Sequence, residues 1–196
     1  VALLYVGTIA FPSPLFAYEA HFGEYRVYSD DPVPASMAGV IEDTARRVKA
    51  MEHEPPRASH RIYLCGSPRL YSFFAFLTRM NPESLAIGLN VANESFVSMT
   101  RVRQFAEKNR ELLRHTRFEG NLAEVIAHEI AHFNSVHALG YRSHLSQPIW
   151  KSEGWAEYQA NIAAIRADPD YDLRKRIDML LRESYWVGNG LARDQW

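Results

Sequence analysis

The hydrophobic pattern of the chain changes near residue 120. Before that point, short apolar or alternating runs bounded by turn-forming residues predict strands, at residues 23–29, 61–65, 85–89 and 94–99. Apolar residues at helical spacing predict helices among them, at residues 36–51, 68–79 and 101–113. We therefore expect a small mixed or antiparallel sheet in the N-terminal half of the chain.

From residue 121 onward the pattern is helical. Asn121 is a suitable N-cap, with Glu124 placed as its capping-box partner, and Gly140 is placed to end the helix. Pro148 suits the first turn of a second helix that ends near residue 167, and residues 171–185 predict a third. The pattern predicts an α+β fold, with a sheet half followed by a helical half. No linker or internal repeat divides residues 1–196, so we expect a single domain.

Composition and charge exclude some classes of function. Lys and Arg number 22 and Asp and Glu number 23, giving a formal net charge of −1. Without a basic run, the sequence gives no reason to expect a nucleic-acid partner. Cys65 is the only cysteine, which excludes an intrachain disulfide and a cysteine-based zinc site.

The first twenty residues allow two interpretations. Residues 1–11 are apolar but too short to span a bilayer as a helix. They fit the tail of a signal or anchor segment, which implies membrane association through a segment upstream of residue 20. They also fit an N-terminal arm folded onto the domain. The first interpretation favours an exported or cell-envelope location over a cytoplasmic one.

The strongest chemical signal is the HExxH sequence of residues 128–132. His128 and His132 are one helical turn apart, so both imidazoles can bind one zinc ion, while Glu129 can take a proton from a water on that ion. Glu129 also falls near the centre of an apolar helical stripe, formed by Leu122, Val125, Ile126, Phe133 and Val136. A buried carboxylate without a partner is strongly unfavourable, so folding alone does not explain Glu129.

A second motif follows in residues 150–158, which read WKSEGWAEY. Gly154 costs about 1 kcal/mol relative to alanine inside a helix, which suggests that another group approaches it closely. Glu153 and Glu157 are four residues apart and share one helical face. One of them can bind the metal while the other accepts an imidazole N–H.

Together the two motifs resemble those of the gluzincin branch of zincin metallopeptidases, in which HExxH precedes a glutamate in the context WxxEGxAxY. The resemblance covers residues 121–167. It implies that Glu153 is the third zinc ligand and that Glu157 is the partner of a histidine. It also implies an exposed edge strand ahead of the motif helix, supplied by residues 85–89 or 95–99, to which an extended peptide could add as a further strand.

The same region offers other candidates for the third metal ligand and for the group that stabilises the oxyanion. The metzincin pattern would require glycine at Ser135 and histidine at Ala138, so His137 is a poor third ligand. The residue that stabilises the oxyanion stays open, with candidates His144 in a loop at residues 141–144, Tyr141, Tyr158 and Tyr185.

These features predict a zinc-dependent peptidase acting on a peptide or protein substrate. Zinc is expected on His128, His132 and Glu153, with Glu129 as general base. One alternative is a zinc-containing binding or regulatory module with little or no catalysis, descended from a peptidase. Another is a structural zinc site, which needs a fourth protein ligand such as His144 or Glu157.

Overall fold

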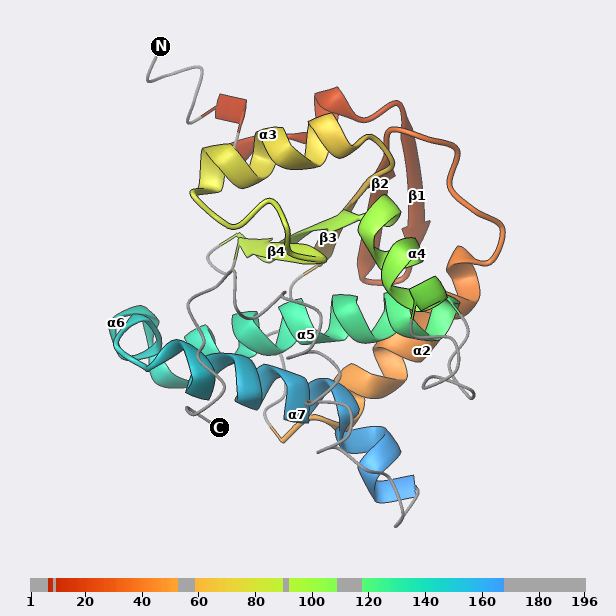
Figure 1. Cartoon of the computed structure of the whole chain (residues 1–196). Coiled ribbons are helices and arrows are strands. Elements are labelled where there is room, and N and C mark those ends of the chain that lie inside the picture. Colours follow the sequence, from red (N-terminus) through yellow and green to blue (C-terminus); the bar gives the residue numbers. More distant parts are fainter. Residues whose placement is uncertain (1–6, 9, 53–58, 90–91, 109–117, 168–196) are drawn as a thin grey trace.

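The computed structural model of the chain describes residues 7–8, 10–52, 59–89, 92–108 and 118–167 (Figure 1). Its strands form one five-stranded sheet in the order β1-β2-β3-β5-β4. The strand bounds are Tyr18–Phe22 for β1, Tyr25–Ser29 for β2, His60–Cys65 for β3, Ala86–Leu89 for β4 and Glu94–Ser98 for β5. Strands β2, β3 and β5 are parallel, and β1 and β4 run antiparallel at the two edges.

The helices follow and interleave with these strands. Their bounds are Met37–Ala50 for α2, Pro68–Thr78 for α3, Met99–Lys108 for α4, Phe118–Leu139 for α5, Tyr141–Leu145 for α6 and Ile149–Ala167 for α7. The predicted α+β class, with the sheet in the N-terminal half and helices in the C-terminal half, is confirmed. The end of the helix predicted at 101–113 and the helix predicted at 171–185 lie outside the described residues.

The first strand was absent from the sequence prediction. Strand β1 reads YEAHF, which alternates apolar and polar residues, but it lies at an edge of the sheet and none of its side chains is fully buried. Residues 23–24 form a tight turn to β2, with Gly23 at φ 60°. Glycine adopts this left-handed conformation without steric cost, as hairpin turns of this kind require.

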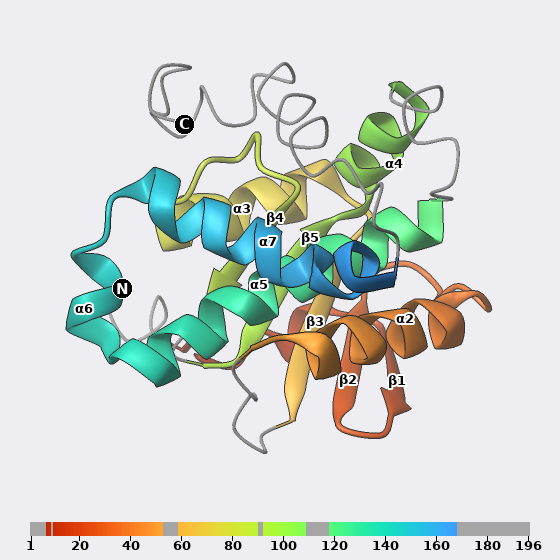
Figure 2. The ribbon, with the colours of Figure 1, turned by 90° about the horizontal axis from the view of Figure 1, so that it is seen from below.

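Helices cover both faces of the sheet (Figures 1 and 2). Side chains alternate along β3, so that Tyr63 packs on the α3 side whereas Ile62 packs with α2 and α5. The α3 side is strongly aromatic, with the rings of Phe74 and Phe96 only 4.3 Å apart between centroids. Helix α5 packs against the sheet, α2 and α7 at once, and it is buried around its circumference from residue 121 to residue 136.

The described part of the N-terminal segment belongs to this fold. A 3₁₀ turn at Ser13–Leu15 leads into β1, and Phe16 packs its ring 5.0 Å from that of Tyr63. Residues 1–6 are outside the described range, and both interpretations of the first twenty residues stay predictions. Across the described residues, none of the helices is both long and apolar enough to cross a bilayer.

Two local predictions in the helical half were wrong. Asn121 is not an N-cap, because α5 begins at Phe118 and Asn121 is buried within the helix. Glu124 therefore completes no capping box there, and its carboxylate accepts a hydrogen bond from Asn161 of α7. The predicted loop at residues 141–144 is instead the short helix α6. Gly140, with φ 80°, separates the end of α5 from the start of α6.

Candidate metal centre

The cluster at the centre of the helical half is formed by α5 and α7. Helix α6 and the residues after it reverse the chain, so that α7 packs back onto α5 (Figure 2). Helix α5 supplies His128 and His132, whose Nε2 atoms lie 3.2 Å apart. Helix α7 supplies Glu153, whose Oε2 lies 3.2 Å from Nε2 of His128 and 3.5 Å from Nε2 of His132. The three ligand atoms thus form a nearly equilateral triangle.

The dimensions of this triangle fit zinc. Zinc binds histidine nitrogen and carboxylate oxygen at about 2.0–2.2 Å, so two ligand atoms of a tetrahedral site lie about 3.3–3.6 Å apart. The three separations in the cluster are close to that range. Two imidazoles and one carboxylate are also a donor set that zinc uses in enzymes.

Each histidine has a partner on its other ring nitrogen. Nδ1 of His128 lies 3.3 Å from Oε2 of Glu157, and Nδ1 of His132 lies 3.3 Å from the hydroxyl of Ser152. Such partners fix the ring orientation and keep the proton on Nδ1, which leaves the Nε2 lone pair for a metal. The sequence pointed to Glu157 in this position and missed Ser152, because an interhelical contact has no signature in residue spacing.

Glu157 is itself held in place by α7. Asn161 donates a hydrogen bond of 3.1 Å to its Oε1 and another to the carboxylate of Glu124 on α5. All three side chains are buried. A continuous polar network therefore runs from Glu124 through Asn161 and Glu157 to the ring of His128, and it fixes the histidine from behind.

The electrostatics of the cluster favour a positive charge at its centre. Burial alone would lower the pKa of His128, but hydrogen bonds to Glu153 and Glu157 outweigh it and raise that pKa well above its usual value. Burial alone would raise the pKa of Glu153, but His132 and His128 hold it well below its usual range. The surroundings stabilise one positive charge between these atoms, whether a proton or a metal cation carries it.

Glu129 lies beside the ligands and is not one of them. Its side chain is buried, and burial raises its pKa. The charges of His128 and His132 act in the opposite direction, and that of Glu153 adds to the rise. Glu129 is therefore close enough to the cluster to feel all three ligands, and its affinity for a proton is increased.

The remaining predicted site residues differ in how near they lie to the cluster. His144 of α6 is buried, with its ring centroid 6.0 Å from that of His132 and its Nδ1 3.2 Å from the Ser135 hydroxyl. Tyr141 is 54% exposed, and the hydroxyl of Tyr158 donates to Glu52 at 3.4 Å, away from the cluster. Tyr185 lies outside the described residues.

The structure brings no fourth protein ligand to the cluster within the described part of the chain. The group of side chains able to hold one ion there consists of His128, His132 and Glu153, with ligand atoms within 4.8 Å of one another. Glu157 contacts the far nitrogen of His128 rather than the centre of the triangle. A tetrahedral ion held by these three groups keeps one position for water or substrate, which is the arrangement of catalytic zinc.

Comparisons with protein-family models, with curated proteins and with solved structures found no match for this chain. The chemistry of the cluster is therefore inferred from its own residues.

Proposed function

We propose that the protein is a zinc-dependent peptidase of the gluzincin type, with zinc held by His128, His132 and Glu153. The observation that carries this proposal is the triangle of ligand atoms with sides of 3.2, 3.2 and 3.5 Å beside a buried glutamate. Zinc in such a site lowers the pKa of a bound water and polarises a substrate carbonyl.

Glu129 acts as the general base and then as the general acid. Its raised pKa makes the carboxylate a better proton acceptor than an exposed glutamate. It takes a proton from the attacking water and delivers that proton to the nitrogen of the leaving amine. The peptide C–N bond breaks, and the water oxygen becomes part of the new carboxylate.

His144 is the oxyanion donor that the surroundings favour. Burial and the neighbouring His132 lower its pKa, so the ring is neutral near pH 7. When the Ser135 hydroxyl donates to Nδ1, the proton of the neutral ring sits on Nε2, where it can be donated to a substrate oxygen. Tyr141 and Tyr158 are less suited, since one is exposed and the hydroxyl of the other is engaged by Glu52.

The substrate adds to the sheet along β4. Of the two segments predicted for this role, residues 95–99 are wrong, because β5 pairs with β3 on one side and with β4 on the other. Strand β4, at Ala86–Leu89, is an edge strand, and α5 packs against it. An extended peptide paired with β4 would run beside the helix that carries His128 and Glu129, with its backbone hydrogen bonds supplied by the strand.

Peptide-library cleavage with and without a chelator tests this function. We expect chelator-sensitive cleavage by the wild type, and a loss of about 10²–10⁴-fold in Glu129→Gln because the proton transfer is removed. Zinc content should be retained in that variant, because Glu129 is not a ligand. Glu94→Gln, which alters a buried carboxylate outside the cluster, serves as the matched control.

Three outcomes separate the alternatives. Wild-type rates in Glu129→Gln would refute the assignment of the base. Stoichiometric zinc without cleavage of any peptide would favour a binding or regulatory module. A zinc site that exchanges no bound water with solvent would favour a structural ion closed by a fourth protein ligand.

A further inference from the structure

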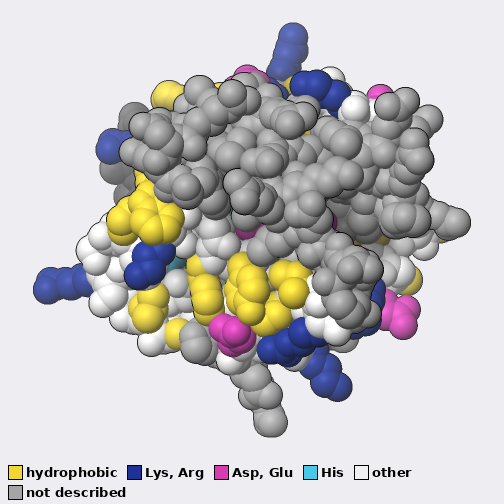
Figure 3. All heavy atoms as spheres, turned by 60° about the horizontal axis from the view of Figure 1, so that its bottom comes forward, with side chains coloured by type: hydrophobic (Ala, Val, Ile, Leu, Met, Phe, Trp, Pro, Cys, Tyr) yellow, Lys and Arg dark blue, Asp and Glu magenta, His cyan; other side chains and the backbone are white. Residues whose placement is uncertain are grey.

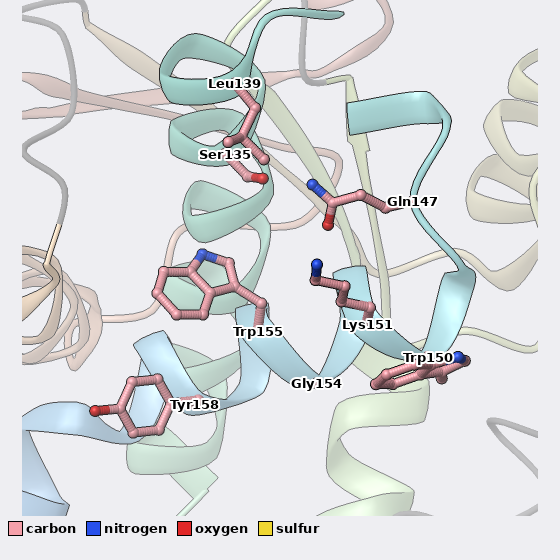
Figure 4. Close-up of a pocket in the computed structure, with 8 residues that line it drawn as sticks. All are labelled: Ser135, Leu139, Gln147, Trp150, Lys151, Gly154, Trp155 and Tyr158. Atoms are coloured by element: carbon pink, nitrogen blue, oxygen red, sulfur yellow. The ribbon is translucent and has the colours of Figure 1, made fainter. Parts of the chain in front are cut away.

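A cavity of about 490 Å³ adjoins the cluster, between the end of α5, the residues before α7 and the first half of α7 (Figure 4). This volume is typical of small-ligand sites. The residues that line it lie outside the proposed catalytic set, apart from Tyr158, whose hydroxyl is bound to Glu52. The peptidase mechanism described above assigns this cavity no part.

Most of its wall is apolar. Leu139 comes from α5, and Trp150, Trp155 and Tyr158 come from α7. The side chains of Leu139 and Trp150 remain 48% and 41% exposed, and Figure 3 shows hydrophobic side chains gathered on the face of the molecule that carries α7. Flat indole and phenol rings around a hollow form a surface that recognises an apolar side chain.

Three polar groups interrupt this wall. They are the hydroxyl of Ser135, the amide of Gln147 and the ammonium group of Lys151. Figure 4 shows the side chains of Gln147 and Lys151 extending toward one another across the cavity. No carboxylate is among the residues that line the described cavity. An ammonium and an amide N–H with no acidic neighbour in the wall are complementary to a carboxylate.

On α7 the cavity and the cluster use neighbouring residues that lie on different faces of the helix. Gly154, in the cavity wall, directly follows Glu153, and Lys151 directly precedes Ser152, which contacts His132. One helical turn advances only about 5.4 Å. On α5, Ser135 lines the cavity and also contacts His144. Ser135 follows His132 by three residues and lies on the same face of α5, so the cavity begins within about one helical turn of the cluster along that helix.

We infer that this cavity binds the C-terminal residue of the substrate peptide, with its apolar side chain against the tryptophans and its free carboxylate on Lys151. The inference rests on the proposed peptidase function and makes the enzyme a carboxypeptidase. Hydrolysis breaks the C–N bond before that residue, places the water oxygen on the new C-terminus and releases the last residue as a free amino acid. Lys151 acts on binding and takes no part in the proton transfers.

The test compares peptides that end in leucine, with either a free C-terminal carboxylate or a carboxamide. For the wild type we expect kcat/KM to be at least about tenfold higher for the free carboxylate, mainly through KM, because the contact is made in the ground state as well as in the transition state. Lys151→Met should reduce this preference to less than about twofold. Lys49→Met removes another exposed lysine, on α2, and should keep the full preference.

Failure of this inference differs from failure of the peptidase proposal. Equal cleavage of both peptides, or a preference for an internal aspartate over a free C-terminus, would overturn the cavity assignment while the peptidase stands. If no peptide is cleaved, binding of N-acetyl-leucine and its amide to the zinc-loaded wild type decides. The cavity assignment is supported if the wild type binds the acid more tightly than the amide and Lys151→Met removes that difference. Equal binding of the acid and the amide by the wild type overturns it.

Discussion

Two regions of the molecule bury histidine, and they do so in different ways. At the start of β3, His60 places one ring nitrogen against the side-chain oxygen of Asn93 and the other 2.9 Å from the hydroxyl of Ser95. Each ring nitrogen has its own partner, so the hydrogen-bonding capacity of the His60 ring is satisfied within the fold. Nothing converges on a common point.

In the cluster of α5 and α7, by contrast, two imidazoles and one carboxylate point at the same small space. The exposed fractions hardly differ, at 4% for His60, 6% for His128 and 8% for His132. The pKa values shift in opposite directions: burial lowers that of His60 to about 4, whereas the carboxylates raise that of His128 well above its usual value. Burial of a polar side chain is therefore not the signal of a site, and convergence of ligand atoms is.

The largest expected difference between the two regions is the loss of unfolding free energy when His60 is replaced. In His60→Ala, the side chains of Asn93 and Ser95 lose their buried partner, and the free energy of unfolding should fall by about 3 kcal/mol. Zinc content of the folded protein should not change. Urea unfolding and metal analysis of the same preparation measure both quantities, and loss of zinc from a protein that is still folded would contradict the separation of the two regions.

A smaller effect is the pH dependence of stability. His60 has a pKa of about 4 in the folded protein and 6.5 as its ordinary value. The unfolded chain takes up the proton first as the pH falls, so the contribution of neutral His60 is complete above pH 6.5 and is lost progressively toward pH 4. Relative to His60→Gln, the wild type should lose on the order of 2–3 kcal/mol over that range.

Urea unfolding of both proteins without metal, at a series of pH values, measures this difference. Glu94 contributes in the opposite direction, because burial raises its pKa to about 7, but it is present in both proteins and cancels. A wild-type advantage that stays constant from pH 7 to pH 4 would show that His60 does not titrate as described.

The smallest effect concerns the partner of a histidine. Glu157→Gln keeps the shape of the side chain but removes the charge that faces Nδ1 of His128. We expect zinc affinity to fall by about 10–100-fold. Competition with a chromogenic chelator measures the affinity. Glu94→Gln is the control, and an equal loss of affinity in both variants would place the effect outside the cluster.

The sequence was informative where one helix carries the pattern. Spacing alone placed His128 and His132 on one side of a helix, and the structure brings Glu153 to them from α7. The strands at 61–65 and 85–89 were predicted to within a residue, because their apolar runs are short and bounded by turn-forming residues.

The sequence was less informative where tertiary packing decides. Asn121 has the chemistry of an N-cap, yet it lies on the same helical face as His128 and His132 and is buried there. The contact between Ser152 and His132 depends on how α7 crosses α5, which local spacing does not encode.

Zinc stoichiometry tests the central claim most directly. Purified wild type, equilibrated with zinc in the presence of a weak competing chelator, should hold about one zinc ion per chain, because three converging ligands bind zinc at catalytic sites. Under the same conditions His60→Ala should hold as much zinc as the wild type, and Glu153→Ala far less. A wild type without zinc, or a Glu153→Ala variant that holds as much as the wild type, would contradict the account.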